Sequence, residues 1–263
     1  MKRIGHLLLV CLLFALPIYS QAESIDSRLL KLDHLSEQIL EFTKAGRYHQ
    51  SKELLETFQR EQVRAQRKND QITEQEWAVI TEARQQAYEL MQSPEGKEQQ
   101  CIERATAFRL AVNAVSSDYK PLWIRMEKPV MTSLNELKKS SSSADHSRFH
   151  ESLNAFLAHY DMLQPSLQLD IPAGRLASLE NHVRYVDHFR ERLLNEGASA
   201  EDIERLEKEV DTIFREMHQE EVPQPSLGWV IGITGGIIMT TLSYVGWRKY
   251  RGEKEEARHK PNH

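Results

Sequence analysis

The sequence predicts an all-α protein of about eight antiparallel helices, followed by one carboxyl-terminal transmembrane helix. The helices are expected to pack as a bundle or as a repeat-like array of helical hairpins. Apolar residues recur at spacings of three and four through most of the chain, and the 21 residues from Leu227 to Trp247 include no charged side chain. With 11 Gly and 9 Pro among 263 residues, the chain has few turn residues for an all-β fold. Its 2 Cys exclude a disulfide-dense scaffold and a four-cysteine zinc module.

The amino terminus has the parts of a secretory signal peptide. The basic residues Lys2 and Arg3 precede an apolar run from Leu7 to Tyr19, and the small residue Ala22 ends the segment. This run is too short to cross a hydrocarbon core of roughly 30 Å. We therefore expect residues 1–22 to be a cleaved signal peptide, with an uncleaved amino-terminal anchor as the alternative.

Residues 23–222 are expected to form an extracytoplasmic helical domain, whose first half contains clear turn and cap signals. Gly46 separates the first two helices in a turn that resembles the midpoint of a tetratricopeptide repeat. No second copy follows at a period of about 34 residues, which favours a repeat-like hairpin array over a true repeat protein. Thr73 and Glu76 form a capping box that begins the third helix, and Pro94 ends it. The predicted apolar faces are Leu29, Leu32, Leu35, Ile39 and Phe42; Tyr48, Ser51, Leu55 and Phe58; Trp77, Ile80, Ala83, Ala87 and Met91; and Ile102, Ala105, Phe108, Val112 and Val115.

The second half of the domain contains more signals that interrupt helices. Pro129 is expected to kink the fifth helix, Ser140–Ser143 to form a flexible connector, and Pro165–Gly174 to form an extended link. A further break is expected at Gly197–Ser199. The predicted apolar faces are Trp123, Met126, Val130, Leu134 and Leu137; Phe149, Leu153, Phe156, Tyr160 and Leu163; Leu176, Leu179, Val183 and Val186; and Ile203, Leu206, Val210, Ile213 and Met217.

The segment 227–247 is predicted to cross a membrane. As a helix it would be about 31 Å long, which matches the hydrocarbon thickness of a bilayer. Residues 223–226 form a linker before it, and residues 248–263 form a basic tail. By the positive-inside rule this tail is cytoplasmic, so the chain is expected to be a single-pass type I membrane protein whose helical domain faces outward. The predicted cytoplasmic anchor consists of Arg248, Lys249 and Arg251.

Small residues recur every four positions along the predicted transmembrane helix. Gly228, Gly232, Gly236 and Thr240 would form a smooth face that allows close approach of a second helix. The pattern predicts either a homodimer or a transmembrane partner. The alternative is that glycine is simply frequent in membrane helices.

The predicted exported part of the chain is acidic. Residues 23–226 carry a formal net charge of −10, since the basic tail and the two leading cations lie outside this range. This charge argues against nucleic acid as a ligand and favours cationic or neutral partners. The alternative is that the charge serves solubility alone.

Several residues have the spacing or type of a reactive site without its other members. His146 and His150 lie four apart, yet no third metal ligand or intervening general base accompanies them. Ser117 and Lys120 have the spacing of a Ser-x-x-Lys motif, but a proline follows directly and the helix is expected to begin only there. Cys101 lies beside an apolar face and is expected to be a partly buried small residue, or else to form an intermolecular disulfide. The sequence therefore predicts no catalytic residue, no cofactor and no metal site.

Three stretches resemble the sporulation protein YpjB family of Bacillus and related endospore formers. They are Pro121–Pro129, Tyr160–Leu167 and Tyr244–Tyr250. The resemblance covers nearly the whole chain and keeps the order of signal peptide, helical body, single span and basic tail. It implies a membrane-anchored protein involved in spore formation, and it supplies no catalytic residue or ligand.

These features lead to one main functional hypothesis and two alternatives. The main one is a non-enzymatic docking or scaffold module that binds a protein partner outside the membrane, because helical hairpin arrays offer extended binding surfaces. The first alternative is an envelope enzyme, or an accessory factor, that acts on peptidoglycan or its precursors. The second is a membrane sensor, which would have to signal through a partner because only 16 residues follow Trp247.

Overall fold

The computed structural model describes residues 27–67, 72–117, 120–142, 146–190, 199–219 and 227–256. All secondary structure in these ranges is helical, which confirms the all-α class and the expected eight helices of the body. The chain divides into a body up to residue 218 and a second unit from residue 219 onward. The predicted signal peptide and the linker 223–226 lie outside the described residues. The helices are α2 (Ser27–Lys44), α3 (Tyr48–Gln66), α4 (Glu74–Leu90), α5 (Glu98–Ser116), the 3-10 helix η2 (Leu122–Met126), α6 (Glu127–Ser142), α7 (His146–Asp170), α8 (Ala173–His188), α10 (Ser199–Gln219) and α11 (Leu227–Glu256).

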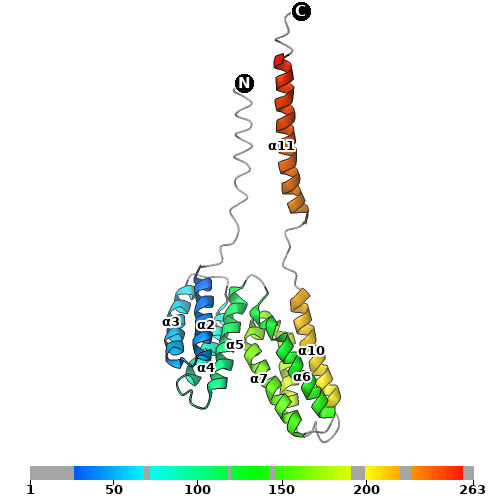
Figure 1. Cartoon of the computed structure of the whole chain (residues 1–263). Coiled ribbons are helices and arrows are strands. Elements are labelled where there is room, and N and C mark those ends of the chain that lie inside the picture. Colours follow the sequence, from blue (N-terminus) through cyan, green and yellow to red (C-terminus); the bar gives the residue numbers. More distant parts are fainter. Residues whose placement is uncertain are drawn as a thin grey trace, which may run out of the picture. The chain divides into compact units, whose positions relative to one another are not determined.

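The first half of the body consists of α2 to α5 (Figure 1). The turn between α2 and α3 depends on Gly46, whose φ of 69° is a left-handed value that other residues rarely adopt. The capping box that begins α4 is confirmed, because the Thr73 hydroxyl accepts from the Glu76 amide at 3.2 Å and the Glu76 carboxylate accepts from the Thr73 amide at 2.6 Å. Phe58 and Phe108 meet edge to face at the centre of this core, with ring centroids 4.8 Å apart.

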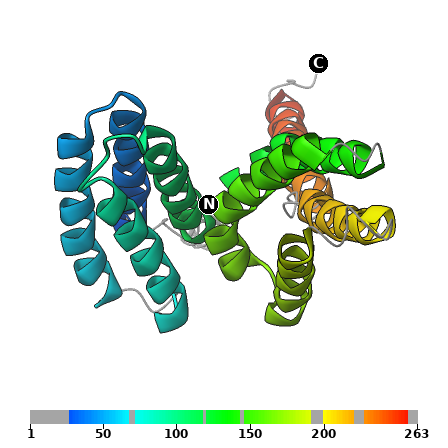
Figure 2. The same cartoon turned by 90° about the horizontal axis from the view of Figure 1, so that it is seen from below.

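The second half of the body consists of η2, α6, α7, α8 and α10 around a separate core. Figure 2 shows the two groups of helices side by side, joined where α5 packs against α7. Trp123 is fully buried in the second core, where its ring lies 5.5 Å from that of Phe214 and its indole nitrogen donates to Asp170 at 2.5 Å. Buried aromatic and aliphatic side chains therefore stabilise each half on its own core.

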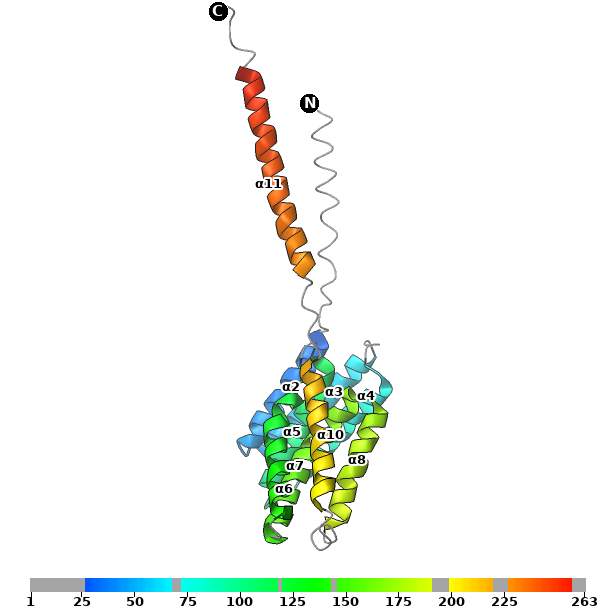
Figure 3. The same cartoon turned by 90° about the vertical axis from the view of Figure 1, so that its right-hand side faces the viewer.

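Figure 3 shows α10 between α6 and α8. Polar side-chain pairs link α10 to both helices. Lys138 of α6 lies 2.7 Å from Glu207 of α10, and this hydrogen bond raises the pKa of the Lys138 ammonium. On the other flank, His182 of α8 pairs with Glu209 of α10. These pairs fix the orientation of α10, whose apolar side chains fill the core.

The predicted extended link Pro165–Gly174 is wrong. α7 continues through Pro165 to Asp170, and only two residues separate it from α8. Pro165 has no amide hydrogen for the carbonyl of Asp161, a loss that costs a helix about 3 kcal/mol. Leu167 and Ile171 continue the buried face of α7 beyond the proline, and their burial offsets this cost.

The flexible connector predicted at Ser140–Ser143 is also wrong over the three residues that the structure describes, since Ser140, Ser141 and Ser142 form the end of α6. Ser140 is 2% exposed, and its hydroxyl lies 3.0 Å from that of Ser152 on α7. It also donates to the Glu136 carbonyl of its own helix at 2.9 Å. These hydroxyls satisfy one another inside the α6–α7 interface, where short side chains allow close helix packing.

The kink expected at Pro129 does not occur in the way predicted. The segment from Trp123 divides into η2 and α6, and Pro129 is the third residue of α6. An amide in the first turn of a helix has no intrahelical acceptor, so proline is accommodated there without a lost hydrogen bond.

The second unit contains α11, a helix of 30 residues. Its helical backbone extends past Trp247, the end of the predicted span, to Glu256. Several apolar side chains along it are exposed, including Ile237 at 60% and Met239 at 73%. Within the described part of the chain, no helix reaches the length and apolar character that crossing a membrane requires.

Candidate binding groove

A groove of about 1070 Å³ lies between the two halves of the body. α4 and α5 of the first half form one wall, and α7 and α8 of the second half form the other. Most of its charged side chains are acidic, with four carboxylates and three cations. The charged residues are Glu89, Lys97, Glu103, Arg104, Asp161, Glu180 and Arg184.

The groove follows from the central position of α7. This helix contacts α4, α5, α6 and α8, so it can turn only part of its surface toward any one neighbour. Phe156 and Leu163 are buried in the second core, whereas Leu157 and Gln164 line the groove. The spacing of three and four therefore gives α7 both a core face and a groove face.

Asp161 is the carboxylate that connects the two walls. Its Oδ2 lies 3.5 Å from Nη2 of Arg104 on α5, and Nη1 of Arg104 donates to Gln86 on α4 at 3.2 Å. Burial raises the pKa of Asp161, and the positive charge of Arg104 lowers it. The negative charges of Glu103 and Asp187 raise this pKa as well. The side chain is 59% exposed, so solvent screens much of this effect. The groove thus has one more carboxylate than cations, and Arg104 is the cation that pairs with Asp161.

Tyr160 supplies an unused polar group beside this carboxylate. The residue is 8% exposed and stacks on Phe156 with ring centroids 6.3 Å apart. Its hydroxyl is buried and has no hydrogen-bond partner among the described residues. Burial raises the pKa of the phenol, so the hydroxyl stays protonated and can both donate and accept. A buried hydroxyl without a partner is costly for the folded protein.

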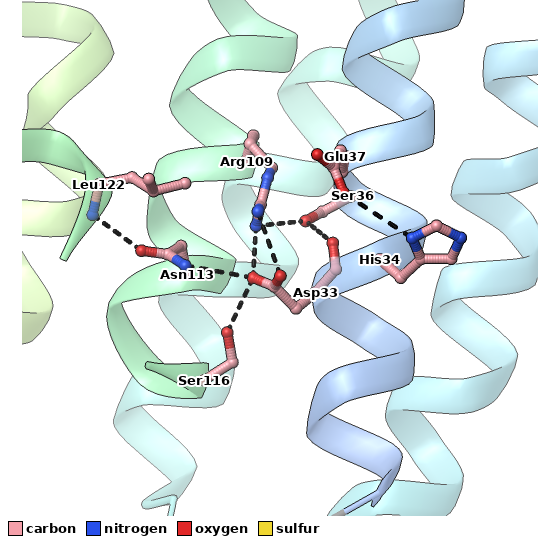
Figure 4. Close-up of polar contacts among 8 residues, drawn as sticks. All are labelled: Asp33, His34, Ser36, Glu37, Arg109, Asn113, Ser116 and Leu122. Atoms are coloured by element: carbon pink, nitrogen blue, oxygen red, sulfur yellow. Dashed lines mark hydrogen bonds and ion pairs between the residues drawn. The ribbon is translucent and has the colours of Figure 1, made fainter. Parts of the chain in front are cut away.

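A polar network around Asp33, drawn in Figure 4, fixes the position of α5. The same helix carries Glu103 and Arg104, which line the groove. Arg109 of α5 donates to both carboxylate oxygens of Asp33 of α2 through its two terminal nitrogens, Nη1 and Nη2, and the Nη2–Oδ2 distance is 3.1 Å. Asn113 and Ser116 also donate to Asp33 Oδ1, at 3.3 and 3.0 Å, and Arg109 donates to the buried Ser36 hydroxyl at 3.2 Å. This arrangement ties α2 to α5 through one carboxylate.

The same network reaches the second half of the body. The side-chain oxygen of Asn113 accepts from the Leu122 amide at the start of η2, at 2.8 Å. Burial alone would raise the pKa of Asp33, but the hydrogen bond and charge of Arg109, with the hydrogen bonds of Asn113 and Ser116, lower it below the usual value. Asp33 is therefore ionised at neutral pH and acts as a structural counter-ion.

The sequence alone predicts neither the groove nor the Asp33 network, because each joins residues from distant parts of the chain. Asp33 and Arg109, for example, are 76 residues apart. The available signal was the charged Arg109 between Phe108 and Leu110, in a helix whose apolar residues occur on nearly all sides. A charged residue in such a buried stretch indicates an ion pair without identifying its partner.

The sequence-predicted packing face lies on α11. A Cβ atom at Gly236 would meet no atom within 4 Å, and the Thr240 hydroxyl donates to the Gly236 carbonyl at 2.7 Å. Gly228 and Gly232 precede them on the same helix. Of the predicted anchor, Arg248 and Lys249 are exposed, whereas the side chain of Arg251 lies outside the described residues. Pairing of two copies through this face stays a prediction.

The structure places the other sequence candidates apart from any shared site. His146 and His150 lie in the first turns of α7, and the described residues contain no group of three or more metal-ligating side chains. Ser117 caps the end of α5, whereas Lys120 donates to the backbone carbonyl of His218 at 3.1 Å. Cys101 is fully buried and free, and burial raises the pKa of its thiol.

Comparison with known proteins identifies relatives over nearly the whole chain. The family model of the sporulation protein YpjB (SpoYpjB) matches residues 29–259. A Bacillus subtilis (strain 168) protein, named "Uncharacterized protein YpjB", is 30% identical over 253 residues, which cover 95% of this chain and 96% of that protein. No solved structure matches significantly.

Proposed function

Because the chain belongs to the sporulation protein YpjB family, we propose that it acts in spore formation as a membrane-anchored scaffold that docks a basic protein segment. The site of docking is the groove between α4 and α5 on one side and α7 and α8 on the other. Membership of this family associates the chain with sporulation. The membrane anchor, the docking site and the basic segment that binds there are our proposal.

The charge around Asp161 is the observation that carries this proposal. The carboxylates of Glu103 and Asp187 act on Asp161 in or near the groove, and Asp187 itself pairs with Arg190. Arg104 is the cation that pairs with Asp161, and its guanidinium also donates to Gln86. A lysine or arginine from a partner would complete this charge balance.

The proposed anchor is the segment Leu227–Trp247 of α11. The sequence supports it with 21 uncharged residues followed by Arg248 and Lys249. The exposed apolar side chains of α11 support it as well, because a helix that is the single described element of its unit has no partner there to bury them. In this arrangement the acidic body faces outward and the basic end of the chain faces the cytoplasm.

Photocrosslinking in sporulating cells tests the docking site in the full-length chain. A photoreactive amino acid at Gln100 or Gln164, which line the groove, should crosslink to a peptide that contains Lys or Arg. The same probe at Lys208, an exposed position of α10 outside the groove, is the matched control. Asp161→Asn should reduce the groove crosslinks and leave those at Lys208 unchanged. Identical crosslinks from all three positions, or a groove crosslink that survives Asp161→Asn, would refute docking at this site.

The raised pKa of Asp161 favours one competing function, an envelope enzyme that acts on peptidoglycan or its precursors. A carboxyl group with a raised pKa can serve as a general acid. Asp161 is more than half exposed and pairs with Arg104, however, and both features keep it ionised at neutral pH. The test is whether the full-length protein releases soluble fragments from purified cell wall. Release that is abolished in Asp161→Asn would establish the enzyme and exclude the scaffold hypothesis.

A further inference from the structure

A second, smaller groove of about 400 Å³ lies between α3 and α4. It is lined by Glu56, Gln59 and Arg60 of α3 and by Arg84, Gln85 and Tyr88 of α4. None of these residues lines the groove proposed for docking. The two sites can therefore be tested separately.

Arg84 is the unusual member of this set. The residue is 4% exposed, and its Nε is buried without a hydrogen-bond partner. Its Nη2 donates to the neutral side chain of Gln85 at 3.1 Å. Within the described part of the chain, no carboxylate lies at ion-pair distance from its guanidinium. Burying a charge without a counter-ion is unfavourable, so this position indicates a missing anion.

The other polar groups of the groove leave Arg84 uncompensated. Glu56 lines the groove, but its Oε1 accepts from the Tyr88 hydroxyl at 3.1 Å, and Glu56 is not among the charges that perturb the pKa of Arg84. Arg60 adds a second guanidinium, which bonds its own helix through Thr57 at 2.9 Å. Burial lowers the pKa of Arg84, yet an arginine stays charged at neutral pH.

We propose that the α3–α4 groove binds a carboxylate, with the guanidinium of Arg84 as its main ligand and Arg60 at the rim. The planar fork of arginine matches the two oxygens of a carboxylate, and a low-dielectric wall strengthens such a charge-assisted hydrogen bond. The carboxylate belongs either to a small organic acid or to an acidic side chain of a peptide. Both share the chemistry that Arg84 recognises.

Side-chain NMR of the full-length protein in detergent micelles tests this site. The Nε–H signal of Arg84, assigned by its loss in Arg84→Lys, should shift saturably on titration with acetate and with a blocked triglutamate peptide. Chloride at matched ionic strength should leave it in place. Tighter binding of the peptide would assign the site to acidic segments, and equal or tighter binding of acetate would assign it to small acids. The proposal is overturned if neither carboxylate shifts the signal more than chloride does, or if inorganic phosphate alone shifts it.

Two variants of exposed carboxylates on α3 keep the test valid if Arg84→Lys fails to fold. Glu56→Gln removes a negative charge from the groove and should tighten acetate binding severalfold, because a like charge no longer opposes the ligand. Glu53→Gln, also on the exposed surface of α3 but outside the groove, is the matched control and should leave affinity unchanged. In a folded Arg84→Lys variant, acetate binding is followed through the Nε–H signal of Arg60, which lines the same groove, and should be at least about tenfold weaker. Equal effects of Glu56→Gln and Glu53→Gln would show that acetate does not enter this groove.

Discussion

Replacing Asp33 by Asn should destabilise the helical body by about 2–4 kcal/mol. The substitution keeps the size of the side chain but leaves Arg109, whose side chain is 10% exposed, without a counter-ion. Breaking a fully buried ion pair costs about 3–5 kcal/mol. The side chain of Asp33 is 25% exposed, so water at this edge replaces part of the lost interaction and lowers the expected cost.

Urea unfolding of the full-length protein, followed by far-UV circular dichroism, measures this effect. Glu37→Gln on the same helix is the matched control, because Glu37 is 60% exposed and pairs only loosely with His34, at 3.7 Å (Figure 4). It should change the free energy of unfolding by less than about 0.5 kcal/mol. The double variant Asp33→Asn, Arg109→Met should cost less than the sum of its two single changes, because it no longer buries an unpaired charge.

The pH dependence gives an independent check of the same ion pair. The pKa of Asp33 is lowered in the folded state from an ordinary value of 3.8, so the folded protein binds this proton less tightly than the unfolded chain. Its contribution to stability is complete above the unfolded-state pKa and is lost as the pH falls through the lower folded-state pKa. Asp33→Asn should therefore lose less stability on acidification than the parent protein. A cost equal to that of Glu37→Gln, or an unchanged acid dependence, would refute the structural role of Asp33.

Three other substitutions or modifications test local features. Tyr160→Phe removes a buried hydroxyl that has no partner, so the free energy of unfolding in urea should stay the same or rise by up to about 1 kcal/mol. A loss of more than about 1 kcal/mol would reveal an unrecognised hydrogen bond. Gly46→Ala places a side chain at a φ of 69° and should cost about 1 kcal/mol by the same assay, whereas a neutral result would contradict this turn conformation. Cys101 is buried and its pKa is raised, so a thiol reagent should label it slowly in the native protein and rapidly in denaturant; equal rates would show that α5 opens readily.

Local chemistry predicted those parts of the fold that depend on neighbouring residues. The capping box at Thr73 and the turn at Gly46 each need only a few adjacent positions, and the sequence identifies both. The prediction for the segment from Pro165 is wrong because its local signal opposes a helix. The burial of Leu167 and Ile171 against distant side chains decides that segment, and this contribution cannot be seen from the segment alone.

The candidate groove could not be predicted for a similar reason. Asp161 and Arg104 each look like solvated surface charges on an amphipathic helix, and only the packing of α5 against α7 brings them together. The sequence does establish the net negative charge of the body, which agrees in sign with the excess of carboxylates in the groove. The sign of the net charge follows from the composition alone, whereas a binding site depends on contacts between helices.

The two proposed sites share one helix, and its geometry explains how they can act independently. α4 presents Gln86 and Glu89 to the acidic groove and Arg84 and Tyr88 to the α3–α4 groove. Because residues two apart on a helix point in clearly different directions, Arg84 and Gln86 cannot contact the same small ligand. Ala83 and Ala87 are buried against the first core, which holds α4 in one orientation while its two flanks face different grooves. A cationic segment at Asp161 and a carboxylate at Arg84 are thus compatible, and loss of either interaction leaves the other site unchanged.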